Sequence, residues 1–112
     1  MVDAERLEVR QARRRRVKVV AGVAALVAGA VAHPHVALEV PGQTLDGRDI
    51  DILRFGGGGP TAKQLWFIAR QHPGETMAEW CAEGIIYRLL DEQDGLARQL
   101  LDNAVFYIVP NM

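Results

Sequence analysis

The chain has 112 residues, the size of one domain or of part of one. Its composition, 49% hydrophobic and 24% charged residues, is typical of a globular protein and excludes an intrinsically disordered chain. The net charge of −1 gives no general attraction for nucleic acid. The single cysteine, Cys81, excludes an intrachain disulfide. We interpret Cys81 as a small buried apolar residue.

The N-terminal segment, residues 1–32, is basic first and apolar afterwards. Residues 1–18 contain seven of the 13 basic residues, and residues 19–32 contain only Val, Ala, Leu and Gly. This pattern fits an Ala-rich helix, an export signal with a cleavage site at residues 30–32, or a membrane anchor. The anchor is the weakest, since 14 uncharged residues are fewer than the roughly 20 that span a bilayer. The arginine run lacks interleaved aromatic residues, so we expect solvated charge and no nucleic-acid binding.

The next segment predicts an antiparallel hairpin. Val36, Leu38 and Val40 alternate with other residues, as in a half-buried strand. The dipeptide at residues 46–47, Asp-Gly, is a hairpin signal, and a second strand follows through Ile50, Ile52 and Arg54. The glycines at 56–59 form a turn. No Lys-Ser/Thr pair follows them, which excludes a phosphate-binding loop.

The second half of the chain predicts a strand, two helices and a strand. Residues 65–69 are continuously apolar, which is typical of a strand buried on both faces. Residues 75–91 predict a helix with Thr76 and Glu79 as a capping box, and a short helix follows through residue 101. Residues 104–109 predict a second buried strand. The expected core face of the long helix is formed by its apolar residues at helical spacing: Met77, Trp80, Cys81, Gly84, Ile85 and Leu89.

This element order predicts an α/β fold, a mixed sheet with flanking helices that follows an Ala-rich N-terminal helix. Open α/β sheets place ligands at the carboxyl ends of their strands. We therefore expect a site at the end of the strand over residues 65–69.

His72 and Glu75 lie at that point, His72 after the strand and Glu75 in the first turn of the predicted helix. An imidazole and a carboxylate on one turn can bind a metal ion together, and Zn²⁺ is the usual choice for such mixed ligands. Alone, His-x-x-Glu is a weak signal, because a loop histidine and a helix-start glutamate stabilised by the macrodipole give the same pattern.

Other polar and aromatic residues nearby receive structural interpretations. Glu79 and Glu83 share a helix face with Glu75 at i, i+4 spacing, and we expect them to be solvated and not to act as acid/base residues. Trp66 and Trp80 are interpreted as core residues and not as platforms for a substrate.

Three blocks, residues 42–49, 70–76 and 105–112, resemble the zinc carboxypeptidase family and its cytosolic carboxypeptidase-like branch. The central block, Arg-Gln-His-Pro-Gly-Glu-Thr, resembles that branch's His-Pro-Gly-Glu zinc motif. The resemblance covers residues 33–112 and implies a zinc metallocarboxypeptidase that removes C-terminal amino acids from peptides or proteins. It implies zinc binding by His72 and Glu75. It also favours the Ala-rich helix over export, and with it a cytoplasmic location; export through residues 1–32 is the alternative.

The resemblance also predicts that the catalytic domain, residues 33–112, is incomplete. The family's Asn-Pro-Asp-Gly motif would begin near Met112, and the third zinc ligand, the substrate-binding arginine and the general base follow it. His33 and His35 precede the zinc motif and do not match that later histidine, so no catalytic residue is assigned. The alternatives are an inert truncated fragment, with an exposed apolar strand edge at residues 104–109, and an exported or membrane-associated domain.

Overall fold

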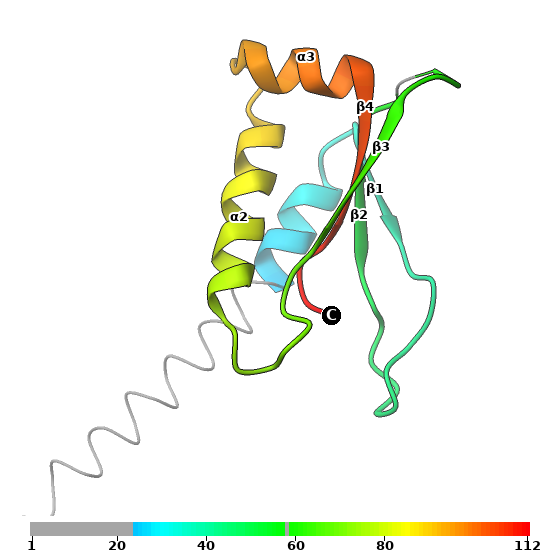
Figure 1. The fold of residues 1–112 in the computed structure, drawn as a ribbon, viewed down its shortest axis with the longest axis vertical. Coiled ribbons are helices and arrows are strands. Elements are labelled where there is room, and N and C mark those ends of the chain that lie inside the picture. Colours follow the sequence, from blue (N-terminus) through cyan, green and yellow to red (C-terminus); the bar gives the residue numbers. More distant parts are fainter. Residues whose placement is uncertain (1–23, 58) are drawn as a thin grey trace, which may run out of the picture.

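The computed structural model describes residues 24–57 and 59–112. One four-stranded sheet has the strand order β1-β2-β4-β3 (Figure 1). The first two pairs in this order are antiparallel, and β3 runs parallel to β4. The predicted α/β fold with a mixed sheet is therefore confirmed. The strands are β1 at Val36–Glu39, β2 at Ile52–Phe55, β3 at Lys63–Ile68 and β4 at Ala104–Val109.

Two helices connect the parallel strands: α2 at Met77–Leu90 and α3 at Gly95–Asn103. The break between them has a clear cause, because the Asp94 side chain accepts hydrogen bonds from the N–H groups of Leu96 and Ala97 at 3.0 and 3.1 Å. These bonds satisfy donors that the first turn of α3 leaves free. The predicted strand at residues 104–109 matches β4, and the predicted long helix is two residues too long at its start and one at its end.

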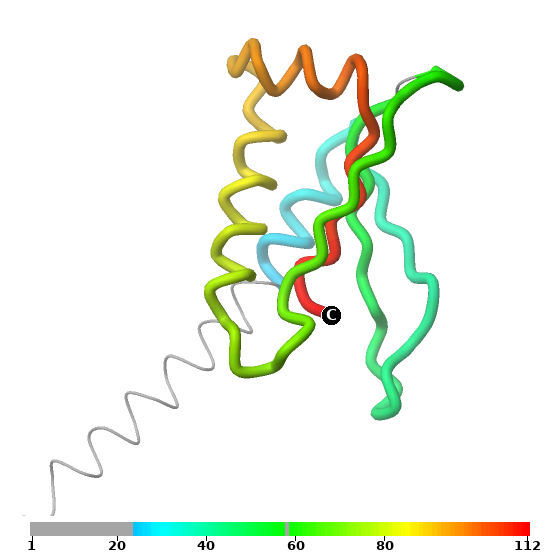
Figure 2. The backbone as a smooth tube through the Cα atoms, in the orientation of Figure 1, coloured from blue at the N-terminus to red at the C-terminus, as the bar shows by residue number. Residues whose placement is uncertain are grey.

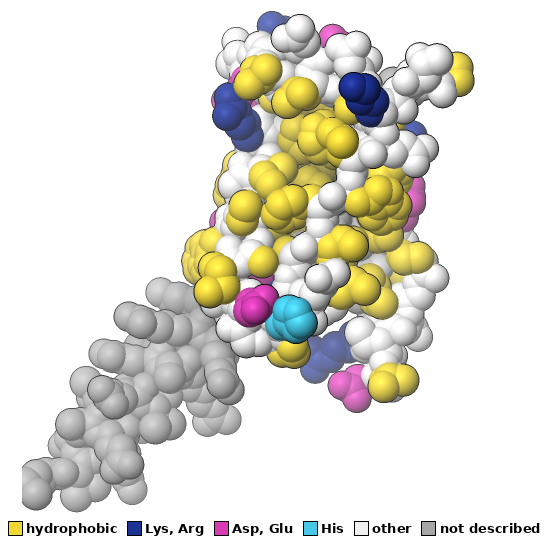
Figure 3. All heavy atoms as spheres, viewed as in Figure 1, with side chains coloured by type: hydrophobic (Ala, Val, Ile, Leu, Met, Phe, Trp, Pro, Cys, Tyr) yellow, Lys and Arg dark blue, Asp and Glu magenta, His cyan; other side chains and the backbone are white. Residues whose placement is uncertain are grey.

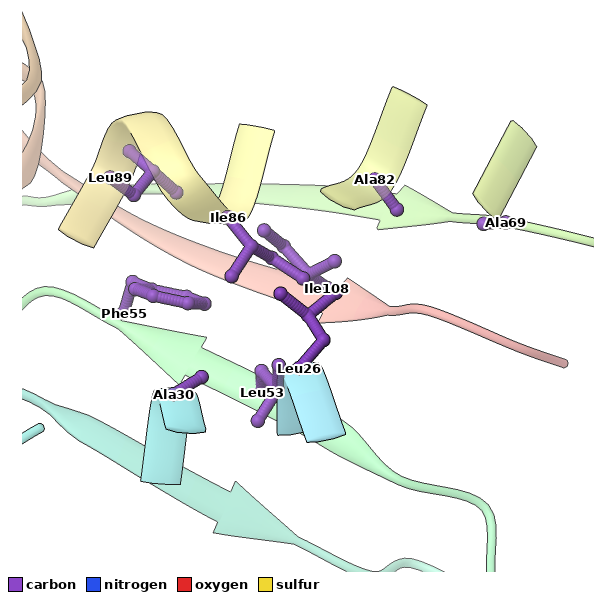
Figure 4. Packing of buried hydrophobic residues seen from close by; sticks show 9 residues of the cluster. All are labelled: Leu26, Ala30, Leu53, Phe55, Ala69, Ala82, Ile86, Leu89 and Ile108. Atoms are coloured by element: carbon purple, nitrogen blue, oxygen red, sulfur yellow. The ribbon is translucent and has the colours of Figure 1, made fainter. Parts of the chain in front are cut away.

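The core lies between the sheet and two helices on one side of it (Figures 1 and 4). The sheet contributes Leu53, Phe55 and Ile108, which are each at most 1% exposed. One helix is α2, and the other covers residues 24–31. From this second helix Leu26 and Ala30 enter the core, at 7% and 1% exposure.

The expected Ala-rich helix therefore packs on the domain over these residues. The arginine run and the rest of residues 1–23 lie outside the described part of the chain. No helix within residues 24–57 and 59–112 has the length and hydrophobicity to cross a membrane.

The predicted core face of α2 is confirmed for Leu89, which is buried, and for Ile85, which is partly buried against the core, but it is wrong for residues nearer the start of the helix. Met77 and Trp80 are 68% and 61% exposed, and Cys81 is also exposed, contrary to its interpretation as buried. The helix has apolar residues on two faces, so its sequence pattern alone does not show which of them meets the sheet. The face that meets the sheet consists of Ala82, Ile86 and Leu89, with Ala78 and Ile85 partly buried beside it.

The expected exposed edge at residues 104–109 is also wrong. Strand β4 is central, because β2 pairs with it on the side opposite β3. The edge is β3, where Leu65, Trp66 and Ile68 are 42%, 56% and 40% exposed. Trp66 is thus not a core residue, and its ring stacks on Tyr107 with centroids 4.5 Å apart. Hydrophobic side chains occupy much of the surface seen in Figure 3.

Candidate metal site

Residues 69–76 lead from the end of β3 to α2, and the first of them, Ala69, is hydrogen-bonded to the end of β4 and to the C-terminal residue. Ala69 is fully buried, and its N–H donates to the Val109 carbonyl at 2.9 Å. Its own carbonyl accepts a hydrogen bond from the Met112 N–H at 3.1 Å. Figure 2 shows the turn and the last residues of the chain side by side. The sheet therefore fixes the point from which the candidate site begins.

The turn itself is compact. Arg70 has a φ of +54°, a left-handed conformation that is uncommon outside glycine. The Glu75 N–H donates to the His72 carbonyl at 3.0 Å. This bond closes the His-Pro-Gly-Glu segment on itself, so that both candidate ligands belong to one turn. Pro73 and Gly74 occupy its middle.

Both candidate ligands are exposed to solvent. Within residues 24–57 and 59–112, no hydrogen bond or ion pair engages the His72 imidazole or the Glu75 carboxylate. An imidazole nitrogen and a carboxylate oxygen are both zinc donors, so the pair fits two positions of a zinc site. No group of three or more His, Cys, Asp or Glu in the described residues is placed to hold a metal ion. This part of the chain therefore offers two ligands where zinc takes three or four.

The other two histidines, His33 and His35, lie outside this turn. His33 Nε2 lies 3.2 Å from Glu92 Oε1, and the His33 and His35 rings are 5.5 Å apart. Both histidines line a hollow that β2 and the junction of α2 and α3 also line, and no residue of the turn over 70–76 lines it. They form a second imidazole–carboxylate cluster that serves as a natural comparison for the first.

The structure overturns the interpretation of Glu79. Its side chain is 5% exposed, and its Oε1 accepts a hydrogen bond from Arg70 Nη1 at 2.8 Å. The expected capping box does not form, since Thr76 is the N-cap of α2 but makes no side-chain cap bond. Glu83 is partly exposed. The pairing of Arg70 with Glu79 has no local signature, because nine residues and a turn separate them.

The sequence profile of the zinc carboxypeptidase family matches residues 23–112. This chain belongs to the zinc carboxypeptidase family. An uncharacterised protein of Zymomonas mobilis is 48% identical over 78% of this chain and 22% of its own length.

Solved structures agree with this assignment. A metallo-carboxypeptidase from Burkholderia cenocepacia is 40% identical, with a TM-score of 0.75, over 79% of this chain and 25% of that protein. A metallo-carboxypeptidase from Pseudomonas aeruginosa, in complex with (2-guanidinoethylmercapto)succinic acid, is 43% identical, with a TM-score of 0.69. That match covers 79% of this chain and 24% of the Pseudomonas protein. The chain thus spans about a quarter of the length of these relatives. The family assignment implies zinc.

Proposed function

We propose that this chain contributes to a zinc-dependent metallocarboxypeptidase that removes C-terminal amino acids from peptides or proteins. His72 and Glu75 are the proposed zinc ligands. The observation that carries the proposal is their position. Both side chains lie on one closed turn at the carboxyl end of β3, no other described residue forms a hydrogen bond or ion pair with them, and the chain belongs to the zinc carboxypeptidase family.

The elements around the turn suit this role. His72 lies three residues after Ala69, which is hydrogen-bonded to Val109 at the end of β4 and to Met112. The turn that carries His72 therefore begins at the sheet. Glu75 lies two residues before α2, so the start of this helix fixes the backbone that carries its carboxylate. Zinc, when bound, supplies a Lewis acid for the scissile carbonyl and lowers the pKa of water. We assign metal binding to these two residues and no catalytic role to any residue of this chain.

The proposed substrate is a peptide or protein C-terminus. The succinic acid derivative in the Pseudomonas relative carries carboxylates, as does the C-terminal residue of a peptide. We also propose a cytoplasmic location. Leu26 and Ala30 belong to the core, and cleavage of an export signal at residues 30–32 would remove Leu26 from it.

Zinc titration of the purified chain by calorimetry tests the proposal. We expect one zinc ion per chain, with binding lost in the His72→Ala and Glu75→Ala variants. His35→Ala is the matched control, since His35 is an exposed histidine outside the turn. Retained binding in His72→Ala, or equal loss in His35→Ala, would refute the assignment of the ligands.

A second candidate is a zinc-binding chain without peptidase activity. It is favoured by the two-ligand site and by the exposed β3 edge. Assays of amino-acid release from peptides separate the candidates. Release that requires both zinc and His72 supports the peptidase, whereas stoichiometric zinc without release supports the inert form.

A further inference from the structure

The Arg70 guanidinium connects the turn over residues 70–76, which we call the metal turn, to α2. Its Nε donates to the Pro73 carbonyl at 3.0 Å, and its Nη1 donates to Glu79 Oε1 at 2.8 Å. Pro73 lies between the two candidate ligands, and Glu79 lies in the first turn of α2. One planar group therefore holds the backbone of the turn and the start of the helix in a fixed relation.

The burial of this pair distinguishes it from an ordinary surface ion pair. The Arg70 and Glu79 side chains are 23% and 5% exposed. The second carboxylate oxygen of Glu79, Oε2, is buried without a hydrogen-bond partner among the described residues. Removing charges from water costs free energy that one contact seldom recovers, so such a pair is a poor means of stabilisation. A role in fixing local geometry accounts better for its presence.

Farther along α2, another pair offers a contrast. Arg88 Nε donates to Asp94 Oδ2 at 2.6 Å, with the Arg88 side chain 63% exposed. This pair joins α2 to the N-cap of α3 and touches no residue of the metal turn. It has the same chemistry in a solvated setting.

We propose that Arg70 and Glu79 are positioning residues of the metal turn. Glu79 holds the guanidinium, and the guanidinium holds the Pro73 carbonyl, which fixes the backbone from which His72 and Glu75 extend. Arg70 has a left-handed φ, and its side chain lies against the turn, where it donates to the Pro73 carbonyl. The inference rests on the proposed function, because the turn matters as a device for presenting two zinc ligands.

Arg70→Lys tests the inference, because a lysine keeps the charge but lacks the guanidinium fork that bonds to two acceptors at once. Glu79→Gln keeps an acceptor for Arg70 without the charge, so its effect should be smaller than that of Arg70→Lys. Arg88→Lys is the matched control. The first readout needs no metal: hydrogen exchange of the Glu75 amide, whose bond to the His72 carbonyl closes the turn.

We expect Arg70→Lys to accelerate exchange of the Glu75 amide about tenfold, the effect of weakening local closure by about 1.4 kcal/mol. Glu79→Gln should give a smaller increase, and Arg88→Lys none. Exchange of the buried Ile86 and Ile108 amides reports global unfolding and should stay unchanged. Equal acceleration at these core amides, or no acceleration at Glu75, would overturn the inference.

The second readout is Co²⁺ affinity and the visible spectrum of the bound ion. Changes in the residues that orient metal ligands typically weaken binding roughly 10- to 100-fold. We expect a loss of that size and an altered spectrum for Arg70→Lys, with neither in Arg88→Lys; identical titrations for the two variants would count against the inference. If the unsubstituted chain bound no Co²⁺, the proposed function would fail for this chain, and the exchange experiment would still decide whether Arg70 fixes the turn.

Discussion

Gly56 tests the packing of the connection that follows β2. Its φ is +87°, and a Cβ added there would lie 2.6 Å from the Ala104 carbonyl oxygen and 3.2 Å from that of Leu101. Both obstacles are backbone atoms at the junction of α3 and β4, so no side-chain rotation relieves the contact. The backbone strain of a non-glycine residue at positive φ is about 1–2 kcal/mol. Overpacking adds about 1–3 kcal/mol.

We therefore expect Gly56→Ala to lower the free energy of unfolding by about 2–5 kcal/mol. With a denaturant slope of about 1–3 kcal/mol per molar urea for a small domain, the unfolding midpoint should fall by about 1 M or more. Gly57→Ala is the control, because its added Cβ would meet nothing within 4 Å and its φ is not positive. Equal midpoints for the two variants in urea unfolding, followed by circular dichroism, would refute this reading of the junction.

Further predictions concern the N-terminal helix, the sheet edge and the α3 cap. Leu26→Ala should cost about 2–4 kcal/mol in urea unfolding, whereas the exposed Val31→Ala should change little; equal effects would contradict a folded role for the helix. We expect the exposed β3 edge to cause self-association, measured by sedimentation velocity. Trp66→Lys should reduce this self-association, whereas Leu45→Lys, at the exposed hairpin tip, should not. The pKa of Asp94 is lowered, chiefly by its hydrogen bond from Arg88 and then by that from the Ala97 N–H. Because the pKa is lowered by folding, the ionised Asp94 carboxylate stabilises the folded chain at pH values above the ordinary pKa of aspartate. This stabilisation is lost as the pH falls through the folded-state pKa. The difference in urea midpoint between the unsubstituted chain and Asp94→Ala should therefore shrink on acidification, and a constant difference would refute it.

Local sequence patterns predict the elements of this fold well. The period-two pattern after Val36, the apolar run at residues 104–109 and the helix before it all appear at or near their expected positions. These signals depend on neighbouring residues only, which is why sequence alone suffices.

Tertiary arrangement accounts for what the sequence did not predict. Helix α2 is apolar on two faces, so its pattern alone could not show that Ala82 and Ile86 would face the sheet while Trp80 would face solvent. The sequence could not show that β3 and not β4 forms the edge of the sheet, because the pairing of β2 with β4 is a contact between distant segments. Likewise, the buried Glu79 carboxylate is paired with the Arg70 guanidinium, a contact between residues nine positions apart in the sequence.

The candidate site shows the same division. His72 and Glu75 could be singled out from their spacing and position, and whether they bind zinc stays a prediction. The partnership of Arg70 and Glu79 required the folded geometry, since it depends on a left-handed residue and on the orientation of α2.

The most direct test of the proposed ligands is to locate bound zinc by nuclear magnetic resonance, because the described residues also bring His33 close to Glu92. Titration of isotope-labelled protein with Zn²⁺ would follow the side-chain resonances of His72 and Glu75 beside those of His33, His35 and Glu92. We expect saturable shifts of the His72 ring and the Glu75 carboxylate at one equivalent, with the resonances of His33, His35 and Glu92 unchanged. Shifts confined to His33, His35 and Glu92, with His72 unaffected, would contradict this assignment of the ligands.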